Sequence, residues 1–420
     1  MNESIKKRIE AVRRGEVPDG YRVENGYLIP KDWKIVPLNK RFTRSTRKNK
    51  SGCENVLTIS AQMGLVNQRE FYDKDIASDD KSGYFLMKKG EFAYNKSYST
   101  GYPYGAIKQL TKYDEGIVSP LYICFAPKAG TNTVFYTQYF ECGRYNREIY
   151  RVAQEGARNH GLLNVAVEDF FEGTLVEPSA GEQQKIAEIL ATCDRVIELK
   201  QCKIDELNKL KQTYLRKMFP QKGKTVPEIR FPDFSDPWEQ RKLGDVCQIT
   251  MGQSPDGDTY SDVPSDYILV QGNADLKNGW VCPRIWTTQK IKTAEAGDLI
   301  MSVRAPAGAM GKTNYNVVLG RGVAGIKGNE FIFQTLVKMY EDGYWKKLAA
   351  GSTFESINSD VISNAEIAVP QDVAEQEKLG AYFRNLDNLI TLHQRELEEY
   401  GKYKKALMQL LLTGLVRVNA

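Results

Sequence analysis

This 420-residue chain contains only two histidines, His160 and His393, and no closely spaced cysteines. So few histidines argue against a histidine metal cluster and against a histidine general acid or base. The seven cysteines are an odd number with no Cys-x-x-Cys pair, which argues against both a disulfide framework and a zinc site. We therefore predict that the chain binds no metal and has no histidine-based catalytic site.

The chain also lacks a long apolar run. No uninterrupted apolar stretch approaches the roughly 20 residues of a membrane span. Residues 1–15 form a charged, helix-like segment without the apolar core of a signal peptide. The formal net charge of +5 is mild for this length, so any nucleic-acid footprint must be local. We expect a soluble, cytoplasmic protein with no membrane partner.

Two segments resemble nucleotide-binding loops but lack an essential part of the motif. Residues 305–313 end in Gly-Lys-Thr, yet Pro306 replaces the required first glycine and has no N–H to offer a phosphate. Residues 320–325 match G-x-G-x-x-G, but no helix pattern follows them. The Asn-Pro-Pro-aromatic tetrapeptide of amino-methyltransferases is missing too. We therefore expect no catalytic residue and no cofactor in this chain.

What the chain does contain is an internal repeat at an offset of 193 positions. Residues 182–219 and 375–412 share an apolar rhythm in which steps of four and three residues alternate, as in a coiled-coil seam. Each stretch follows a proline and opens with acidic residues, as helix N-termini do. The predicted seam residues are Ile186, Leu190, Cys193, Ile197, Ile204 and Leu207 in the first helix, and Leu379, Phe383, Leu386, Ile390, Leu397 and Tyr400 in the second.

The repeat extends outside the helices, since Trp33 and Trp238 each precede an apolar, strand-like run. We predict an α+β fold with two mixed α/β domains, separated by two long helices and related by a pseudo-twofold axis. The predicted parts are an N-terminal extension and first domain (1–176), a central helix (177–221), a second domain (222–369) and a C-terminal helix (370–420).

The connections favour an antiparallel pair of helices. A helix of about 38 residues is about 57 Å long, and the second domain leaves the end of one helix and enters the start of the other. Antiparallel packing therefore needs the shortest connection. A symmetric crossing would pair residues whose numbers add to about 590, with Ile197 opposite His393 and Lys200 opposite Ile390.

Two similar domains at a fixed separation suit a split, asymmetric DNA target. Between Lys31 and Lys50 there are eight Lys and Arg residues and a single acid, Asp32. We interpret this basic run, which includes Lys48, as a loop that grips phosphates. A solvated loop is the alternative interpretation.

Several short motifs occur in a characteristic order. The helices begin with Glu-Gln-Gln-Lys (182–185) and Glu-Gln-Glu-Lys (375–378). Further motifs occupy residues 94–105, 119–122, 252–255, 301–306, 320–322 and 351–354. With these motifs the whole chain resembles the specificity subunits of type I restriction-modification systems. The charged segment 1–26 departs from the plainest family pattern, and its role is open.

The resemblance implies two target recognition domains, each reading half of a bipartite sequence in double-stranded DNA. It implies that the helices set the spacer and dock two methyltransferase subunits that bind S-adenosylmethionine. Motor-nuclease subunits that consume ATP would complete the multisubunit restriction endonuclease and adenine methyltransferase. The chain itself would be non-catalytic.

Side-chain chemistry guides the choice of DNA contacts, since Asn and Gln can pair with adenine edges and Lys or Arg with guanine. Besides Lys48, the candidates in the first domain are Gln62, Tyr94, Asn95, Lys96, Tyr98, Tyr102, Tyr104 and Lys108. Those in the second are Gln253, Ser254, Gln271, Asn273, Arg304, Lys312 and Arg321, with Ser352 and Thr353 as phosphate contacts. For about half of them the alternative is that the tyrosines pack in the core and the turns only fold the chain.

Two other functional classes stay open. A self-contained DNA methyltransferase would need a cofactor site, and binding of S-adenosylmethionine by the pure chain would support it. A non-catalytic coiled-coil scaffold would not need two domains rich in Arg, Lys and Tyr near turns. Failure to bind DNA even with partner subunits would favour the scaffold.

Overall fold

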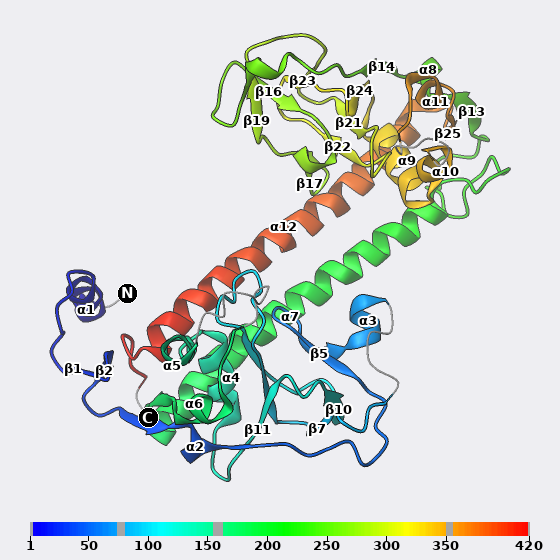
Figure 1. Ribbon diagram of the computed structural model, residues 1–420. Coiled ribbons are helices and arrows are strands. Elements are labelled where there is room, and N and C mark those ends of the chain that lie inside the picture. The colour runs from blue at the N-terminus through cyan, green and yellow to red at the C-terminus, as the bar shows by residue number, and fades with distance from the viewer. Residues whose placement is uncertain (1–2, 74–79, 154–162, 350–355, 419–420) are drawn as a thin grey trace. The chain divides into compact units, whose positions relative to one another are not determined.

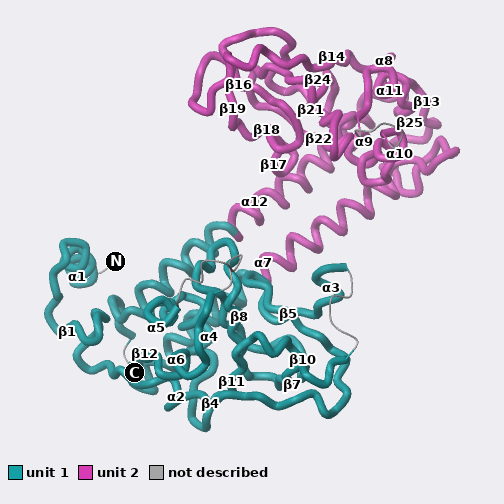
Figure 2. Tube along the Cα trace, viewed as in Figure 1, with its two compact units in different colours: residues 1–198, 398–420 teal, residues 199–397 magenta. Residues whose placement is uncertain are grey.

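The computed structural model describes residues 3–73, 80–153, 163–349 and 356–418. The chain forms two compact units, which Figure 2 colours separately. Unit 1 comprises residues 1–198 and 398–420, and unit 2 comprises residues 199–397. Two long helices, α7 (Ala180–Lys217) and α12 (Val373–Leu412), contribute to both units (Figure 1). Among the described residues, no helix is long and apolar enough to cross a membrane.

Unit 1 begins with a short helix and a hairpin and continues into a mixed domain before α7. Its elements are α1 (Glu3–Arg13), β1 (Tyr21–Glu24), β2 (Tyr27–Pro30), β3 (Lys34–Pro37), α2 (Leu38–Arg41), β4 (Phe42–Arg44), β5 (Leu57–Ser60), β6 (Gly64–Asn67), α3 (Gln68–Tyr72), β7 (Phe85–Lys88), β8 (Phe92–Asn95), β9 (Ala106–Gln109), β10 (Glu115–Val118), β11 (Ile123–Pro127), α4 (Thr133–Glu141), α5 (Asn146–Val152), α6 (Val167–Glu172) and β12 (Thr174–Glu177).

The centre of unit 1 is a four-stranded antiparallel sheet with the order β4-β11-β8-β9. Helix α4 packs on it beside β9. Between sheet and helix lies an aromatic core in which Phe42 meets Phe92 and Phe125 edge-on, with ring centroids 5.5 and 5.3 Å apart. The first half of α7 joins this core through Ile186 and Leu190, so the helix is anchored to the domain by apolar burial.

Unit 2 has more and shorter strands. Its elements are β13 (Glu239–Lys242), α8 (Leu243–Val246), β14 (Gln248–Met251), η1 (Gly257–Thr259), β15 (Tyr260–Ser261), β16 (Tyr267–Val270), η2 (Asn273–Asp275), β17 (Leu276–Lys277), β18 (Trp280–Val281), β19 (Ile285–Thr287), β20 (Thr293–Ala294), β21 (Leu299–Ser302), β22 (Met310–Lys312), β23 (Val317–Leu319), β24 (Val323–Lys327), α9 (Glu330–Glu341), α10 (Tyr344–Ala349), α11 (Ser359–Ser363) and β25 (Glu366–Val369).

Most strands of unit 2 lie in two mixed sheets. One has the order β14-β24-β21-β22-β18-β17, and the other has the order β15-β19-β16-β23-β20. Helix α9 packs beside β22, and its Phe331 and Leu336 share a core with Phe383 of α12. Helices and strands are thus mixed in both units, and the predicted α+β class is confirmed.

Equivalent elements of the two units make equivalent contacts. Strand β3 pairs antiparallel with β12 in unit 1, as β13 does with β25 in unit 2. The indole N–H of Trp33 donates to Glu182 at 3.0 Å, and that of Trp238 donates to Glu375 at 3.4 Å. Since both glutamates lie in the first turn of a long helix, each tryptophan ties its domain to the start of that helix.

Ion pairs show how the long helices face each other within each unit. The pairs are Asp194–Lys404 in unit 1 and Lys200–Glu396 and Lys211–Asp387 in unit 2. The helix segments within each unit therefore run antiparallel, and the residue numbers of each pair add to 596–598.

The predicted sum of about 590 was wrong by about one heptad, so the facings Ile197–His393 and Lys200–Ile390 are not those of the structure. A slide of seven residues leaves the same apolar stripe facing inward, so only charged side chains distinguish the two registers.

Most predicted seam residues are buried. The buried ones are Ile186, Leu190, Ile204, Leu207, Leu379, Phe383, Leu386 and Ile390, and the partly buried ones are Cys193, Ile197 and Leu397. Tyr400 is exposed and leaves the stripe, which fits the drift of a 3.6-residue helix against a 3.5-residue repeat.

Candidate nucleic-acid interface

In unit 2 several strands end at one edge of the sheets. Met251 of β14 pairs with Ala324 of β24, and Ser302 of β21 pairs with the neighbouring Val323. Strand β16 runs parallel to β23, so both also end together. The segments that follow therefore gather at this edge. We call residues 252–254, 271–273, 303–306 and 320–322 the loop edge of unit 2.

The loops of this edge pack backbone against backbone. A Cβ atom on Gly252 would lie 2.1 Å from the carbonyl oxygen of Gly320, and one on Gly322 would lie 2.0 Å from that of Gln271. Backbone hydrogen bonds join the loops, including those from Gly320 N to Val270 O at 2.8 Å and from Val303 N to Gly322 O at 2.9 Å. Only glycine allows this approach, so the edge has a fixed backbone.

The loop edge of unit 2 carries six predicted DNA contacts. Gln253, Arg304 and Arg321 are exposed, and Gln271, Asn273 and Ser254 are partly buried. Asn273 also lines a cavity of about 440 Å³ beside α7 and α12. Amides and guanidinium groups on a rigid edge are the chemistry that hydrogen-bonds base edges.

Lys312 lies away from this edge, although it was predicted to contact DNA together with the other candidates of the second domain. It is largely buried, its ammonium group donates to Glu330 at 2.9 Å, and it lies 4.9 Å from the ring centre of Trp280. The Lys312 ammonium group therefore serves an ion pair inside the protein and does not face DNA at the loop edge. Ser352 and Thr353 lie outside the described residues.

Unit 1 has a corresponding edge. Tyr94 and Asn95 at the end of β8 pair with Ile123 and Ala106, and Val56, which directly precedes β5, forms a parallel bridge with Ile117 of β10. The following turns and loop therefore lie at one side of the domain. We call residues 61–63, 96–105 and 119–122 the loop edge of unit 1.

Exposed side chains at this edge include two predicted contacts, Gln62 and Tyr98. Met63 directly follows Gln62, Leu121 lies in segment 119–122 of the same edge, and the two are 65% and 70% exposed. Neither apolar residue was predicted as a contact, because hydrogen bonding to bases guided the choice of candidates. Their signal was an apolar residue within a turn.

The other candidates of unit 1 are engaged within the protein. Tyr94 is fully buried, its hydroxyl donates to the carbonyl oxygen of Tyr104 at 2.9 Å, and burial raises its pKa. Lys108 is largely buried and pairs with Glu141, which also accepts from the Tyr102 hydroxyl.

Lys96 and Asn95 are engaged as well. The Lys96 ammonium group donates to Val165 O at 2.8 Å, and burial lowers its pKa. The Asn95 side-chain oxygen accepts from Ser97 N at 3.0 Å. Both side chains are partly buried and stabilise the loop that follows β8.

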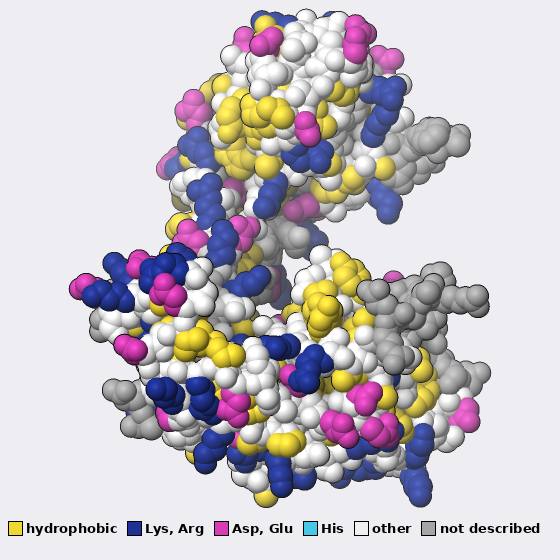
Figure 3. All heavy atoms as spheres, turned by 60° about the vertical axis from the view of Figure 1, so that its left-hand side comes forward, with side chains coloured by type: hydrophobic (Ala, Val, Ile, Leu, Met, Phe, Trp, Pro, Cys, Tyr) yellow, Lys and Arg dark blue, Asp and Glu magenta, His cyan; other side chains and the backbone are white. Residues whose placement is uncertain are grey.

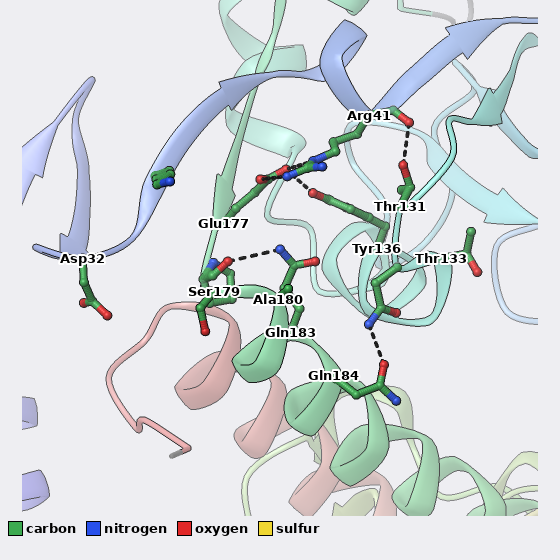
Figure 4. Close-up of a pocket in the computed structure, with 14 residues that line it drawn as sticks. Asp32, Arg41, Thr131, Thr133, Tyr136, Glu177, Ser179, Ala180, Gln183 and Gln184 are labelled. Atoms are coloured by element: carbon green, nitrogen blue, oxygen red, sulfur yellow. Dashed lines mark hydrogen bonds and ion pairs between the residues drawn. The ribbon is translucent and has the colours of Figure 1, made fainter. Parts of the chain in front are cut away.

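Two cations of the basic run pair with buried acids of the same domain. Arg41 donates to Glu177 at 2.7 and 2.8 Å beside a cavity of about 670 Å³ at the start of α7 (Figure 4). Arg47 pairs with Glu91 at 3.1 Å.

Lys48 is exposed, although its ammonium group donates to Gly83 O at 2.7 Å. Arg44 and Lys50 are exposed too. Part of the run therefore stabilises the fold.

Basic side chains form no single dominant patch on the visible face. Figure 3 shows Lys and Arg spread over each unit with Asp and Glu among them. This distribution agrees with the mild net charge of +5. Any phosphate contacts must therefore come from a few local cations.

Comparison with known proteins defines the class. A family model for the type I restriction modification DNA specificity domain matches residues 235–400. A protein of Methanocaldococcus jannaschii, provisionally described as the type I restriction enzyme MjaX specificity subunit, is 31% identical over 410 residues, covering 93% of this chain and 95% of the relative. The MjaVIII specificity subunit of the same organism is 26% identical over 288 residues, covering 62% and 66%. This chain belongs to the family of type I restriction enzyme specificity subunits.

Solved structures share the fold. The S subunit of a type I restriction-modification system from M. genitalium matches with a TM-score of 0.58 at 13% identity, covering 93% of this chain and 97% of that one. A chain from a structure on complex assembly and conformational transition of the type I R-M system matches with a TM-score of 0.54 at 20% identity, covering 93% and 100%.

Proposed function

We propose that each unit of this specificity subunit reads one half of a bipartite, asymmetric target in double-stranded DNA through its loop edge. The observation that carries the proposal is the convergence of Gln253, Gln271, Arg304 and Arg321 on one glycine-packed edge. Rigidly held amides and guanidinium groups can discriminate base pairs in the major groove. The proposal assigns DNA reading to the domain that follows the N-terminal extension within residues 1–176 and to the domain of residues 222–369.

The two long helices have a different role in this proposal. Residues 177–221 and 370–420 form an antiparallel coiled coil that sets the spacer between the half-sites. The helices also dock two methyltransferase subunits, which bind S-adenosylmethionine, and motor-nuclease subunits join them on DNA in the cytoplasm. This chain then supplies specificity within a restriction endonuclease and adenine methyltransferase and carries no chemistry itself.

Exposed apolar side chains on the helices support the docking role. Leu199 and Leu392 are 60% and 51% exposed and stand 193 positions apart, at equivalent places in the repeat. Leu210 and Tyr403 are a second equivalent pair, and both are exposed. Repeated apolar positions suit two copies of one partner, since identical partners need similar surfaces.

The test is to exchange residues 31–176 for the corresponding segment of another specificity subunit. The exchanged protein is expressed with its methyltransferase, and methylated bases are mapped by sequencing. One half-site should change while the other half-site and the spacer stay the same. A change in both half-sites would contradict independent reading by the two units.

A further inference from the structure

The loop that carries Gln271 is held by a buried carboxylate. Asp275 is 2% exposed, and its Oδ2 atom accepts hydrogen bonds from the backbone N–H groups of Gln271 at 2.7 Å and Gly272 at 3.2 Å. Its Oδ1 atom accepts from Nε and a terminal nitrogen of Arg284 at 2.9 and 2.7 Å. One carboxylate therefore receives four donors.

Two further backbone bonds complete the arrangement. Asp275 N donates to Gly272 O at 3.0 Å, and Cys282 N donates to Asp275 O at 2.8 Å. Asp275 thus joins the loop after β16 to the segment that enters β19. A buried carboxylate needs such partners, since an uncompensated buried charge is costly.

The other side of the same loop is blocked by glycines. A Cβ atom on Gly320 would lie 3.1 Å from Cα of Gln271, and one on Gly322 would lie 2.0 Å from its carbonyl oxygen. The backbone of Gln271 is therefore fixed between the glycines of one loop and the carboxylate of Asp275. The Cα atom from which the Gln271 side chain extends therefore has little freedom to move.

We propose that Asp275, held by Arg284, is a positioning residue that sets the sequence preference of unit 2 through the placement of Gln271. The inference rests on the proposed function. A bidentate contact between an amide and a base edge tolerates only small displacements, so loss of the carboxylate relaxes discrimination at the base that Gln271 contacts. Asp275 itself touches no DNA.

The experiment uses the full chain co-expressed with its methyltransferase subunits, with methylated bases mapped across the genome. Asp275→Asn keeps the shape of the side chain but replaces one carboxylate oxygen with an NH2 donor, so it cannot accept from both Arg284 and the loop N–H groups. Arg284→Lys keeps the charge but replaces the two-pronged donor. Asp262→Asn, at an exposed aspartate of the same unit, is the matched control for loss of a negative charge.

We expect Asp275→Asn to lower discrimination about tenfold at one position of the half-site read by unit 2. The other half-site and the spacer should be unchanged, and Asp262→Asn should leave the target unaltered. Gln271→Ala should relax the same position, and the double variant should be no less specific than Gln271→Ala alone. A folded Asp275→Asn protein with an unaltered target overturns the proposal.

The melting temperature of each variant distinguishes misfolding from a specific loss of base discrimination. If Asp275→Asn lowers the melting temperature and abolishes all methylation, Arg284→Lys decides: a relaxed position at the same half-site supports the proposal, and an unaltered target overturns it. If Gln271→Ala, Gln253→Ala and Arg321→Ala all leave the target unaltered, the proposed function itself fails. If those three variants change the target and both Asp275→Asn and Arg284→Lys do not, only the role of Asp275 fails.

Discussion

Arg417 and Glu182 form a bidentate ion pair in unit 1, with Nε and a terminal nitrogen donating at 2.7 and 2.8 Å. Arg230 makes the same pair with Glu375 in unit 2, also at 2.7 and 2.8 Å. Arg417 follows the end of α12, and Arg230 follows the end of α7. In each unit, therefore, the segment after one long helix is fixed to the first turn of the other.

Neutralising either glutamate should destabilise the protein. Glu375→Gln should cost about 3 kcal/mol, because removing one partner of a buried ion pair leaves the other charge uncompensated. Glu182→Gln should cost less, since Arg417 is 32% exposed whereas Arg230 is 12% exposed. Denaturant unfolding measures both, with the exposed Glu198→Gln as control. Equal losses in all three variants would contradict this ranking.

Acid should weaken the contact between Asp32 and Arg417. The hydrogen bond from Arg417 lowers the pKa of the Asp32 carboxyl, and the two side chains lie 2.6 Å apart. The carboxyl pKa in the unfolded chain is about 3.9, and the ion pair stabilises the folded protein fully above that pH. This stabilisation is lost as the pH falls through the lower pKa of the folded state. Asp32→Asn should therefore reduce the loss of stability below about pH 4. Unfolding curves of both proteins from pH 6 to pH 3 measure it.

A base-reading cation should alter preference at one position. Arg304→Ala should relax specificity in the half-site of unit 2 and cost about 1 to 3 kcal/mol of discrimination. Binding of the assembled methyltransferase to a panel of single-base variants measures it. A uniform loss across the panel would instead assign Arg304 to the DNA backbone.

A phosphate-binding cation should act on all sequences alike. Lys48→Ala should weaken binding to target and non-target DNA and reduce the slope of log affinity against log salt by about one. Salt titrations of binding measure the slope. An altered sequence preference would show that the basic run does more than grip phosphates.

Much of the fold could be predicted from the sequence because its signals are local. The heptad steps from Ile186 to Leu207 and the tryptophans before each domain reveal two helices and a repeat. The helix register could not be predicted, since a slide of one heptad preserves the apolar stripe. The contacts that distinguish the registers, such as Lys211–Asp387, look like ordinary surface charges in the sequence.

Only some of the candidate DNA contacts lie at an exposed loop edge, again because some decisive contacts are with residues far away in the sequence. Glycine pairs mark the close approach of loops, and the polar residues beside them lie at the loop edge of unit 2. Lys108 and Lys312 have the same chemistry, yet each is paired inside the protein. Burial of a long polar side chain depends on an acid that is distant in the sequence, so residue type alone cannot reveal it.

The helices provide the last prediction, which concerns the spacer. Deleting one heptad from each helix, residues 197–203 together with 390–396, removes both Lys200 and Glu396. The pairs Asp194–Lys404 and Lys211–Asp387 remain. Both pairs can still form in one common helix register, because the same number of residues is removed from each helix between them. Because seven residues are removed from each helix, the apolar stripe is preserved.

The paired helices should shorten by about 10.5 Å at about 1.5 Å per residue. At about 3.4 Å per base pair, the spacer between half-sites should contract by roughly three base pairs while both half-sites keep their sequence. Rotation about the duplex should weaken binding as well, since three base pairs turn the half-sites relative to each other. Methylation mapping measures the spacer, and deletion of a heptad from α7 alone is the control, because it breaks the ion-pair register. An unchanged spacer in a folded, active double-deletion variant would show that the helices do not set the distance.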